Sequence, residues 1–357
     1  MTKRRVRLAF VGGEHLHFEG LLRAALAAPS AEVVGFAIAD DELRQWFAAA
    51  YSGVAAFAAA DELYERAAPE AIITCADNAR AAEVIAEAAA RGVQVMKEKP
   101  MAASLALAER MATTSARAGI RLMINWPHNW SPARHHAKRL ADDGAIGRAW
   151  QVHYRSAHGG PPPDYLTLGP VARVGWGWLI ERARNGAGAA IDYCGYGAVL
   201  SRWLLGQPSR VSGMGGRYAK EFFTVDDNAV MLLGYPRGHS VIEVSWTQPA
   251  VEAPVPTQIY GETGAIAIMS QTELRLANRG SAGELVSTAA ETITAEALPD
   301  HFISGPEYFC SCLLRDLPFD GMVSVAASRD AQEILEAGLL SMATGQEVGL
   351  PLKSFLA

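Results

Sequence analysis

A glycine pair at the end of an apolar run is the first feature that suggests chemistry. Residues 5–11 are β-rich and apolar, and they lead into Gly12-Gly13-Glu14-His15-Leu16-His17. Glycines at such a turn let the backbone approach a pyrophosphate, and the following helix N-terminus supplies N–H donors and positive potential. We therefore expect Gly12, Gly13 and His15 to contact the phosphates of a dinucleotide.

Glu14 departs from the G-x-G-x-x-G pattern, because it stands where the second glycine belongs. A carboxylate that faces a pyrophosphate would repel it. Two interpretations remain open. Either the loop is rearranged and His15 or His17 offsets the acid, or phosphate binding is weakened.

Asp40 follows the second expected strand, residues 33–39. A carboxylate at this position can accept hydrogen bonds from both ribose hydroxyls of an adenosine, and it would repel a 2′-phosphate. The alternative is that Asp40 caps the helix that begins at Asp41. If Asp40 binds ribose and no well-placed arginine lies nearby, NAD is the expected cofactor and NADP is disfavoured.

A charged turn, Lys97-Glu98-Lys99-Pro100, follows the expected strand 93–97. Ligands collect at the carboxyl ends of strands in open parallel sheets, so this turn is well placed for a site. Taken alone, it is also typical of a solvated turn.

The elements that must position these residues alternate between strand and helix over residues 1–125. Strands that are apolar throughout, separated by amphipathic helices, indicate a parallel sheet covered on both faces, which is a doubly wound Rossmann domain. The expected strands are 5–11, 33–39, 71–74, 93–97 and 122–124, and the expected helices are 19–28, 41–50, one capped by Asp61, 79–91 and one capped by Ser104 that ends near Gly119.

The pattern changes after residue 125. A helix (131–143), a strand (150–155) and a long helix (188–205) precede consecutive strand-like runs over residues 211–278. Consecutive strands without helices between them indicate an antiparallel sheet. We therefore expect an α+β domain over residues 126–357, with an open-faced, largely antiparallel sheet and two closing helices, 307–314 and 328–343.

Two motifs resemble the signatures of the Gfo/Idh/MocA (glucose-fructose oxidoreductase / inositol dehydrogenase) family. The first is Glu98-Lys99-Pro100, and the second is Gly186-Ala-Gly-Ala-Ala-Ile-Asp192-Tyr-Cys-Gly-Tyr196, which is similar to GGGALxDxGxH. Some members of the family carry tyrosine in place of the final histidine. Further matches follow in order at residues 143–147, 204–208, 227–229, 261–264 and 345–352, so the resemblance covers nearly the whole chain.

The resemblance implies that Lys99, Asp192 and Tyr196 meet at the nicotinamide. Tyr196 would be the general base, because a cationic Lys99 beside a phenol favours the phenolate and stabilises developing alkoxide charge. Asp192 would orient the substrate hydroxyl or Lys99. Asp192 and Tyr196 share one helix face if residues 188–205 are helical. The alternatives are a core aromatic for Tyr196 and a helix-end carboxylate for Asp192. The full set of expected cofactor-binding residues is Gly12, Gly13, His15, Asp40, Thr74, Asn78, Glu98 and Lys99.

Aromatic side chains that could stack on a sugar stand near the expected site. They are Trp126, His128, His158, Trp176 and Trp178, and each has packing as its alternative role. The expected activity is that of an NAD-dependent oxidoreductase, which transfers a hydride between a secondary alcohol of a sugar, inositol or glycoside and nicotinamide. A redox-neutral NAD-dependent glycoside-cleaving enzyme and a non-catalytic sensor of cofactor or metabolite are the alternatives.

Composition excludes several other classes. The net charge of −6 argues against a nucleic-acid surface. No apolar run is long enough to span a membrane, and none resembles a signal sequence, so we expect a cytoplasmic protein. The four cysteines are scattered, which predicts reduced, mostly buried thiols and no metal site. The remaining expectation is a homo-oligomer, a dimer or tetramer, since an open sheet needs cover.

Overall fold

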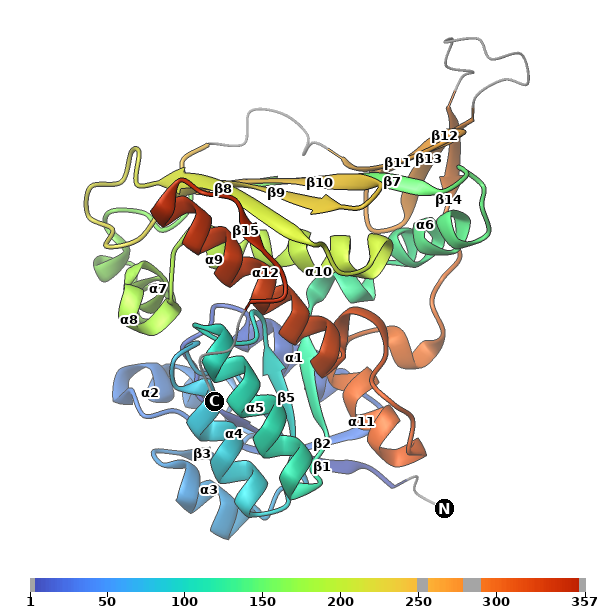
Figure 1. Ribbon diagram of the computed structural model, residues 1–357. Coiled ribbons are helices and arrows are strands. Elements are labelled where there is room, and N and C mark those ends of the chain that lie inside the picture. The colour runs from blue at the N-terminus through green and yellow to red at the C-terminus, as the bar shows by residue number, and fades with distance from the viewer. Residues whose placement is uncertain (1–3, 249–255, 279–289, 353–357) are drawn as a thin grey trace. The chain divides into compact units, whose positions relative to one another are not determined.

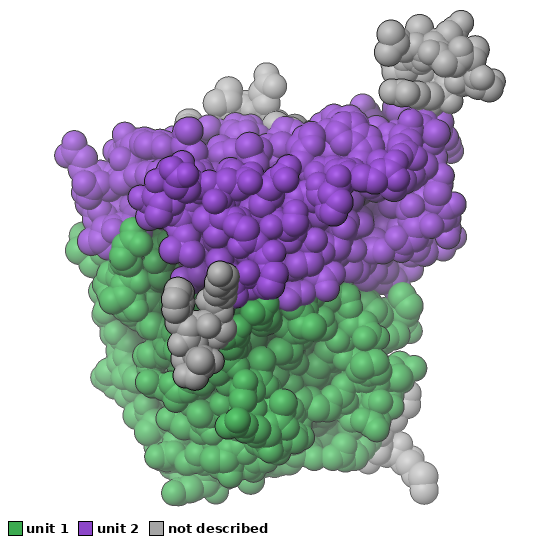
Figure 2. Space-filling view, viewed as in Figure 1, with its two compact units in different colours: residues 1–126, 161–188, 299–329 green, residues 127–160, 189–298, 330–357 purple. Residues whose placement is uncertain are grey.

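The computed structural model describes residues 4–248, 256–278 and 290–352, and Figure 1 shows its elements. The chain forms two compact units, coloured separately in Figure 2. Unit 1 comprises Met1–Trp126, Pro161–Gly188 and Pro299–Arg329, and unit 2 comprises Pro127–Gly160, Ala189–Leu298 and Asp330–Ala357. The domain boundary expected after residue 125 lies next to the first change of unit, between Trp126 and Pro127. Residues 161–188 and 299–329, which belong to unit 1, were expected in the second domain.

Unit 1 contains a six-stranded sheet in the order β3-β2-β1-β4-β5-β6, and all of its strand pairs are parallel. This is the doubly wound order of a Rossmann fold, so the predicted architecture is confirmed. The strands are β1 (Val6–Val11), β2 (Ala31–Ala37), β3 (Ala56–Phe57), β4 (Ala71–Thr74), β5 (Gln94–Glu98) and β6 (Leu122–Asn125).

The helices of unit 1 follow local signals closely. Ser104 accepts a hydrogen bond from the Leu107 N–H and begins α5, and Gly119 ends it with φ at 69°. The predicted cap at Asp61 was wrong, since α3 begins at Ala60. The helices are α1 (Phe18–Ala27), α2 (Asp41–Ala50), α3 (Ala60–Ala67), α4 (Ala81–Ala90), α5 (Leu105–Ala118), α7 (Pro170–Gly177), α8 (Arg182–Asn185) and α11 (Gly305–Arg315), with 3-10 turns η2 (Tyr165–Thr167), η3 (Trp178–Ile180), η4 (Asp300–Phe302) and η5 (Gly321–Val323).

Unit 2 contains a nine-stranded sheet in the order β14-β13-β12-β11-β7-β10-β9-β8-β15. Its strands pair antiparallel except for β7 and β10, which confirms the largely antiparallel prediction. The strands are β7 (Ala149–Ala157), β8 (Arg210–Gly216), β9 (Asn228–Tyr235), β10 (Gly238–Ser245), β11 (Thr257–Gly261), β12 (Gly264–Ile268), β13 (Glu273–Asn278), β14 (Glu291–Thr294) and β15 (Val348–Gly349).

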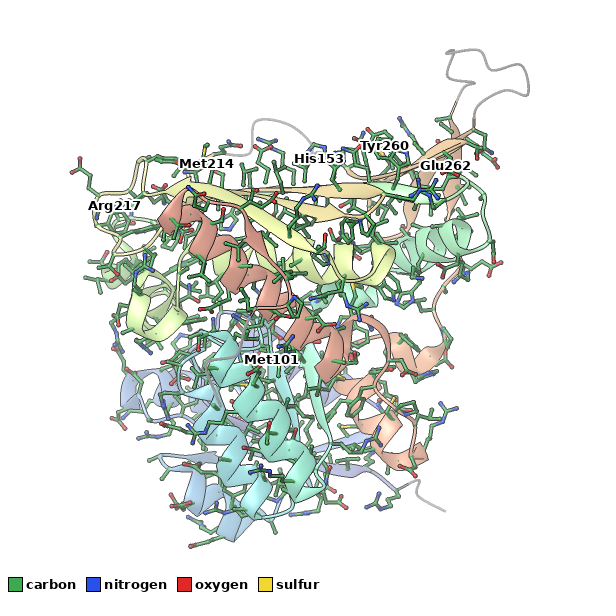
Figure 3. All side chains as sticks on the ribbon, viewed as in Figure 1. Met101, His153, Met214, Arg217, Tyr260 and Glu262 are labelled. Atoms are coloured by element: carbon green, nitrogen blue, oxygen red, sulfur yellow. The ribbon has the colours of Figure 1, made fainter. Side chains whose placement is uncertain are left out.

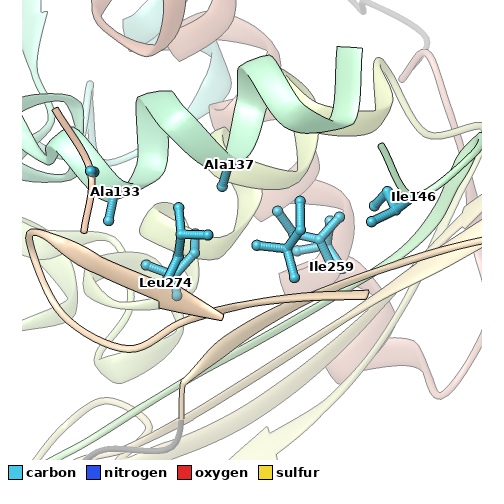
Figure 4. Packing of buried hydrophobic residues seen from close by; sticks show 9 residues of the cluster. Ala133, Ala137, Ile146, Ile259 and Leu274 are labelled. Atoms are coloured by element: carbon cyan, nitrogen blue, oxygen red, sulfur yellow. The ribbon is translucent and has the colours of Figure 1, made fainter. Parts of the chain in front are cut away.

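Helices cover one face of this sheet. Helix α6 (Pro132–Asp142) packs Ala133 and Ala137 against Ile259 and Leu274 of the strands, as Figure 4 shows. Figure 3 shows Met214, His153 and Tyr260 on the opposite face. The other helices of the unit are α9 (Ala189–Asp192), α10 (Cys194–Leu205) and the part of α12 (Val325–Thr344) from residue 330 onward; α12 begins in unit 1.

All four cysteines are buried free thiols, as predicted. Among the described helices, none is both long enough and apolar enough to cross a membrane.

Candidate cofactor and active site

The glycine turn lies where β1 ends and the order of the sheet reverses. The Gly12 N–H donates to the Ala37 carbonyl at 2.9 Å, and the His15 N–H donates to the Cys75 carbonyl at 3.0 Å. Gly12 has φ at 80°, and a Cβ there would lie 2.8 Å from the Ala76 nitrogen. Only glycine fits this turn, because the Ala76 backbone and the Glu14 carboxylate pack against it.

Glu14 is held by a partner that the sequence did not indicate. Arg80 Nη1 donates to Glu14 Oε1 at 2.8 Å, and the Trp178 indole donates to the Glu14 carbonyl at 2.8 Å. Burial raises the pKa of the Glu14 carboxyl, while the Arg80 charge opposes that rise. The acid is therefore offset by Arg80, and not by His15 or His17.

His15 presents a fixed, uncharged donor next to this turn. Its Nδ1 accepts a hydrogen bond from the His17 N–H at 3.0 Å, which places the ring proton on Nε2. The side chain is 5% exposed, and its Nε2 has no hydrogen-bond partner among the described residues. Burial lowers the pKa of His15 well below its usual value, and the nearby His17, Lys99 and Lys97 lower it further. His15 is thus a neutral N–H donor at pH 7.

One group in the described chain has the composition of a metal site. His15, His17 and Glu98 bring their ligand atoms within 4.8 Å of one another. Their hydrogen bonds account for the grouping, since His17 Nδ1 lies 2.8 Å from Glu98 Oε1 and His15 Nδ1 accepts from the His17 backbone. Coordination through His15 Nε2 would require the proton to move to Nδ1 and break that bond. The absence of a metal stays a prediction.

A cavity of about 340 Å³ lies beside Asp40 within unit 1. Gly13, Ile38 and Asp40, from the ends of β1 and β2, form one wall, and Arg173 and Gly177 of α7 form another. An acid-bearing cavity beside the glycine turn is the place where a Rossmann fold binds an adenosine.

Asp40 has two engagements in this cavity. Its Oδ1 accepts from the Leu43 N–H at 2.9 Å, so Asp40 is the N-cap of α2, and its role toward ribose stays a prediction. Arg173 Nη2 donates to both carboxylate oxygens at 3.0 Å. The expectation that no well-placed arginine lies nearby was therefore wrong.

Buried hydrogen bonds from Lys97 hold the charged turn after β5 in place. This lysine is fully buried, and its Nζ donates to Asn78 Oδ1 at 3.0 Å and to the Pro100 carbonyl at 2.8 Å. Burial lowers the pKa of Lys97 to about 8. Asn78 in turn donates to Asn185 Oδ1 at 2.8 Å, so this predicted cofactor ligand buttresses the turn that carries Lys99.

The remaining predicted cofactor residues are also buried at strand ends. Thr74 closes β4 and accepts the Ala76 N–H at 3.3 Å through its hydroxyl. Glu98 ends β5, and its Oε2 accepts from the Asn125 amide at 2.6 Å. Lys99 is 2% exposed. Their contacts with a cofactor stay predictions.

The second motif runs from unit 1 into unit 2 along the chain, between Gly188 and Ala189. The predicted helix 188–205 is interrupted at Tyr193, so Asp192 ends α9 and Tyr196 lies in α10. The Asp226 carboxylate accepts the Ala190 N–H at 2.7 Å and thereby caps α9. Asp192 and Tyr196 therefore lie on successive helices, and not on one regular helix face.

Aromatic rings surround Tyr196 within unit 2. The centre of its ring lies 4.6 Å from that of His128 and 5.7 Å from that of Tyr193, which lies 4.8 Å from the His158 ring. Two predicted substrate residues, His128 and His158, thus belong to the same cluster as the predicted base. Lys99 belongs to unit 1, and its meeting with Asp192 and Tyr196 stays a prediction.

The predicted tryptophans lie in unit 1, and two of them are core residues. Trp178 is fully buried, and Trp126 is 1% exposed and donates to Ser328 Oγ at 3.0 Å. Packing, the alternative given above, accounts for both. Trp176 is half-buried in α7, and its role toward substrate stays a prediction.

Sequence reasoning missed Arg80, Arg173 and Tyr193. Tyr193 stands inside the second motif, so its place in the sequence was a usable signal. Arg173 contacts Asp40 across 133 residues of sequence, and nothing local indicates that contact.

A parallel sheet in this order, with a glycine turn where the order reverses and an acid-bearing cavity beside it, is the architecture of a dinucleotide-binding protein. The family comparisons agree. The model of the oxidoreductase family with an NAD-binding Rossmann fold matches residues 6–126, and the Gfo/Idh/MocA C-terminal domain model matches residues 135–267. The chain belongs to the Gfo/Idh/MocA family and is an NAD(P)-dependent oxidoreductase.

Several characterised proteins resemble this chain over most of its length. It is 26% identical to D-xylose 1-dehydrogenase [NADP(+)] of Haloarcula marismortui, covering 88% of this chain and 85% of that protein. It is 26% identical to D-apiose dehydrogenase of Paraburkholderia graminis over 74% of this chain and 68% of that protein. The fold is shared with levoglucosan dehydrogenase in complex with NADH and levoglucosan, at a TM-score of 0.81 and 18% identity over 98% of this chain and 100% of that one.

Proposed function

We propose that the protein is a dehydrogenase that transfers a hydride between a secondary alcohol of a sugar, inositol or glycoside and NAD. The observation that carries this proposal is the cavity bounded by Gly13 and Asp40 next to the glycine turn. The sugar dehydrogenases among its relatives support the carbohydrate class of substrate.

The residues present fit a bound dinucleotide. The buried Nε2–H of His15, next to the glycine turn, has no acceptor among the described residues, and a cofactor oxygen would supply one. The nicotinamide supplies the hydride acceptor when it is bound. NAD is the proposed form, because the Asp40 carboxylate can accept hydrogen bonds from ribose hydroxyls.

The protein supplies the acid–base chemistry. Tyr196 accepts the hydroxyl proton as the hydride leaves the carbon, and the Lys99 ammonium stabilises the developing alkoxide. Asp192 orients the hydroxyl or the lysine. The neighbouring His128 ring, tilted at 48° with its centre 4.6 Å away, supports this assignment, because it restricts the orientation of the Tyr196 ring.

A panel of polyols, aldoses and glycosides tests the proposal. Each is offered with NAD and with NADP, and nicotinamide reduction is followed by its absorbance. Reduction with at least one secondary alcohol is expected, and NAD should be the better acceptor. No reduction with any compound, together with no binding of either dinucleotide, would contradict the proposal. We also propose that the protein is cytoplasmic and that it self-associates.

A further inference from the structure

The cavity beside Asp40 combines two parts of unit 1 that are far apart in sequence. One wall comes from the ends of β1 and β2, and the other comes from α7 in the 161–188 segment. Arg173 of α7 donates to both oxygens of Asp40 at 3.0 Å and to Glu42 Oε2 at 3.1 Å. The wall that would receive the ribose of an adenosine therefore carries a cation as well as an acid.

The geometry of this guanidinium leaves part of it available. Among the described residues, its hydrogen bonds all run from Nη2, so Nε and Nη1 can serve another acceptor. The Arg173 side chain is 34% exposed, which allows it to change partners. A guanidinium offers a planar fork of donors that matches a phosphate.

We propose that Arg173 determines how the protein distinguishes NAD from NADP. It offsets the charge of Asp40, and it supplies Nε and Nη1 to the 2′-phosphate when NADP binds. Asp40 alone would exclude that phosphate. Asp40 paired with Arg173 accepts both dinucleotides and leaves NAD only moderately preferred. This inference rests on the proposed function, because it assumes that the cavity receives the adenosine end of the cofactor.

A matched control is present in the same cavity. Arg184 also lines it, but its Nε is held by Asp77 Oδ2 at 2.9 Å. Arg173→Gln and Arg184→Gln therefore each remove one positive charge from the cavity wall, and only the first removes the partner of Asp40.

The test compares 5′-AMP with adenosine 2′,5′-bisphosphate, which differ only in the 2′-phosphate, by calorimetry on the full chain. Loss of a hydrogen-bonded charge pair weakens binding about ten-fold or more, so Arg173→Gln should raise the Kd of the bisphosphate by that factor. The Kd of 5′-AMP should change far less. Asp40→Asn should act in the opposite sense and tighten binding of the bisphosphate.

Three results would overturn the inference. The first is an unchanged ratio of the two dissociation constants in Arg173→Gln, and the second is an equal effect of Arg184→Gln. In both cases the proposed function survives. The third is a wild-type chain that binds neither nucleotide, which would remove the adenosine end from this cavity; the reduction assay with NAD and NADP then tests the proposed function separately. Circular dichroism shows whether the Arg173→Gln variant is folded. If it is not, Arg173→Lys, which keeps the charge but not the planar fork, replaces it in the same measurement. It should lose part of the bisphosphate affinity, and an unchanged ratio would count against the proposal.

Discussion

At the scale of single residues, Tyr196 is the residue on which the proposed chemistry depends most. It is 7% exposed and its ring packs against that of His128, so removing only its hydroxyl should leave the fold intact. Tyr196→Phe is expected to lower kcat by roughly 100- to 10,000-fold, as is typical when a general base is lost. Binding of the dinucleotide should be retained.

Tyr193→Phe is the matched control for this substitution, because the two rings are neighbours at 5.7 Å and only Tyr196 has the proposed role. It should retain turnover within about three-fold, well under the loss expected for a missing base. Near-normal turnover of Tyr196→Phe would place the base elsewhere, and His128 would be the next candidate.

Some residues of the site could be recognised from the sequence and others could not. The glycine turn and Asp40 were recognisable because glycine and an acid at strand ends have local meaning. The role of Asp40 as a helix cap was recognisable for the same reason, since it precedes a helical segment. Arg173 and Arg80 were not, because their importance comes from contacts with Asp40 and Glu14 that only tertiary folding creates.

At the scale of elements, the turn after β5 depends on a buried lysine. Lys97 has a pKa of about 8 in the folded protein because burial disfavours its charge. The unfolded chain keeps its proton up to a pH of about 10.4. Between these values the unfolded state binds more protons, so Lys97 makes the free energy of unfolding rise with pH.

Lys97→Met should therefore remove this rise. The difference in unfolding free energy between wild type and variant should shift by up to about 3 kcal/mol in favour of the wild type from pH 8 to 10.5. Urea denaturation at several pH values measures it, and Lys138→Met, a lysine paired with Asp142 on α6, is the control. A difference that stays constant with pH would show that Lys97 is not desolvated as described.

Element boundaries were predictable where caps and turns are local. Helix α2 and strand β4 have the predicted bounds, and α5 begins and ends at its predicted caps. The interruption at Tyr193 was not predicted, because no proline marks it and the nearby Gly195 lies inside the following helix. The two-residue strand β3 was too short to give a periodic signal.

At the scale of the whole molecule, the open face of the unit 2 sheet favours self-association. Met214, Val230 and Leu232 are 75%, 37% and 48% exposed, and the first two are paired across β8 and β9. An exposed apolar patch on a sheet is commonly covered by a second copy. We expect light scattering to show a dimer or tetramer at micromolar concentration.

Met214→Lys combined with Leu232→Lys should shift this assembly toward monomer, because two charges would have to be buried in the interface. Thr113→Lys, an exposed position on α5 of unit 1, is a control that should leave the assembly unchanged. A wild-type monomer at the same concentration would contradict the expectation.

The organisation into two units was only partly predictable from the sequence. The change from alternating elements to consecutive strands marks the junction near residue 126, since that change is local in sequence. The assignment of residues 161–188 and 299–329 to unit 1 depends on long-range packing, such as the hydrogen bonds that the Ser30 N–H and hydroxyl donate to the Glu307 carboxylate at 2.9 and 2.8 Å. No periodicity reports such contacts.

The proposed function depends on the direct transfer of a hydride from a carbinol carbon to nicotinamide. The most direct measurement uses an alcohol found in the substrate panel, deuterated at the carbon that is oxidised, with unlabelled NAD. Mass spectrometry of the reduced cofactor should show one deuterium per molecule, and Tyr196→Phe should slow its appearance without changing the label. Reduced cofactor without deuterium, or a product formed while NAD stays oxidised, would contradict the account.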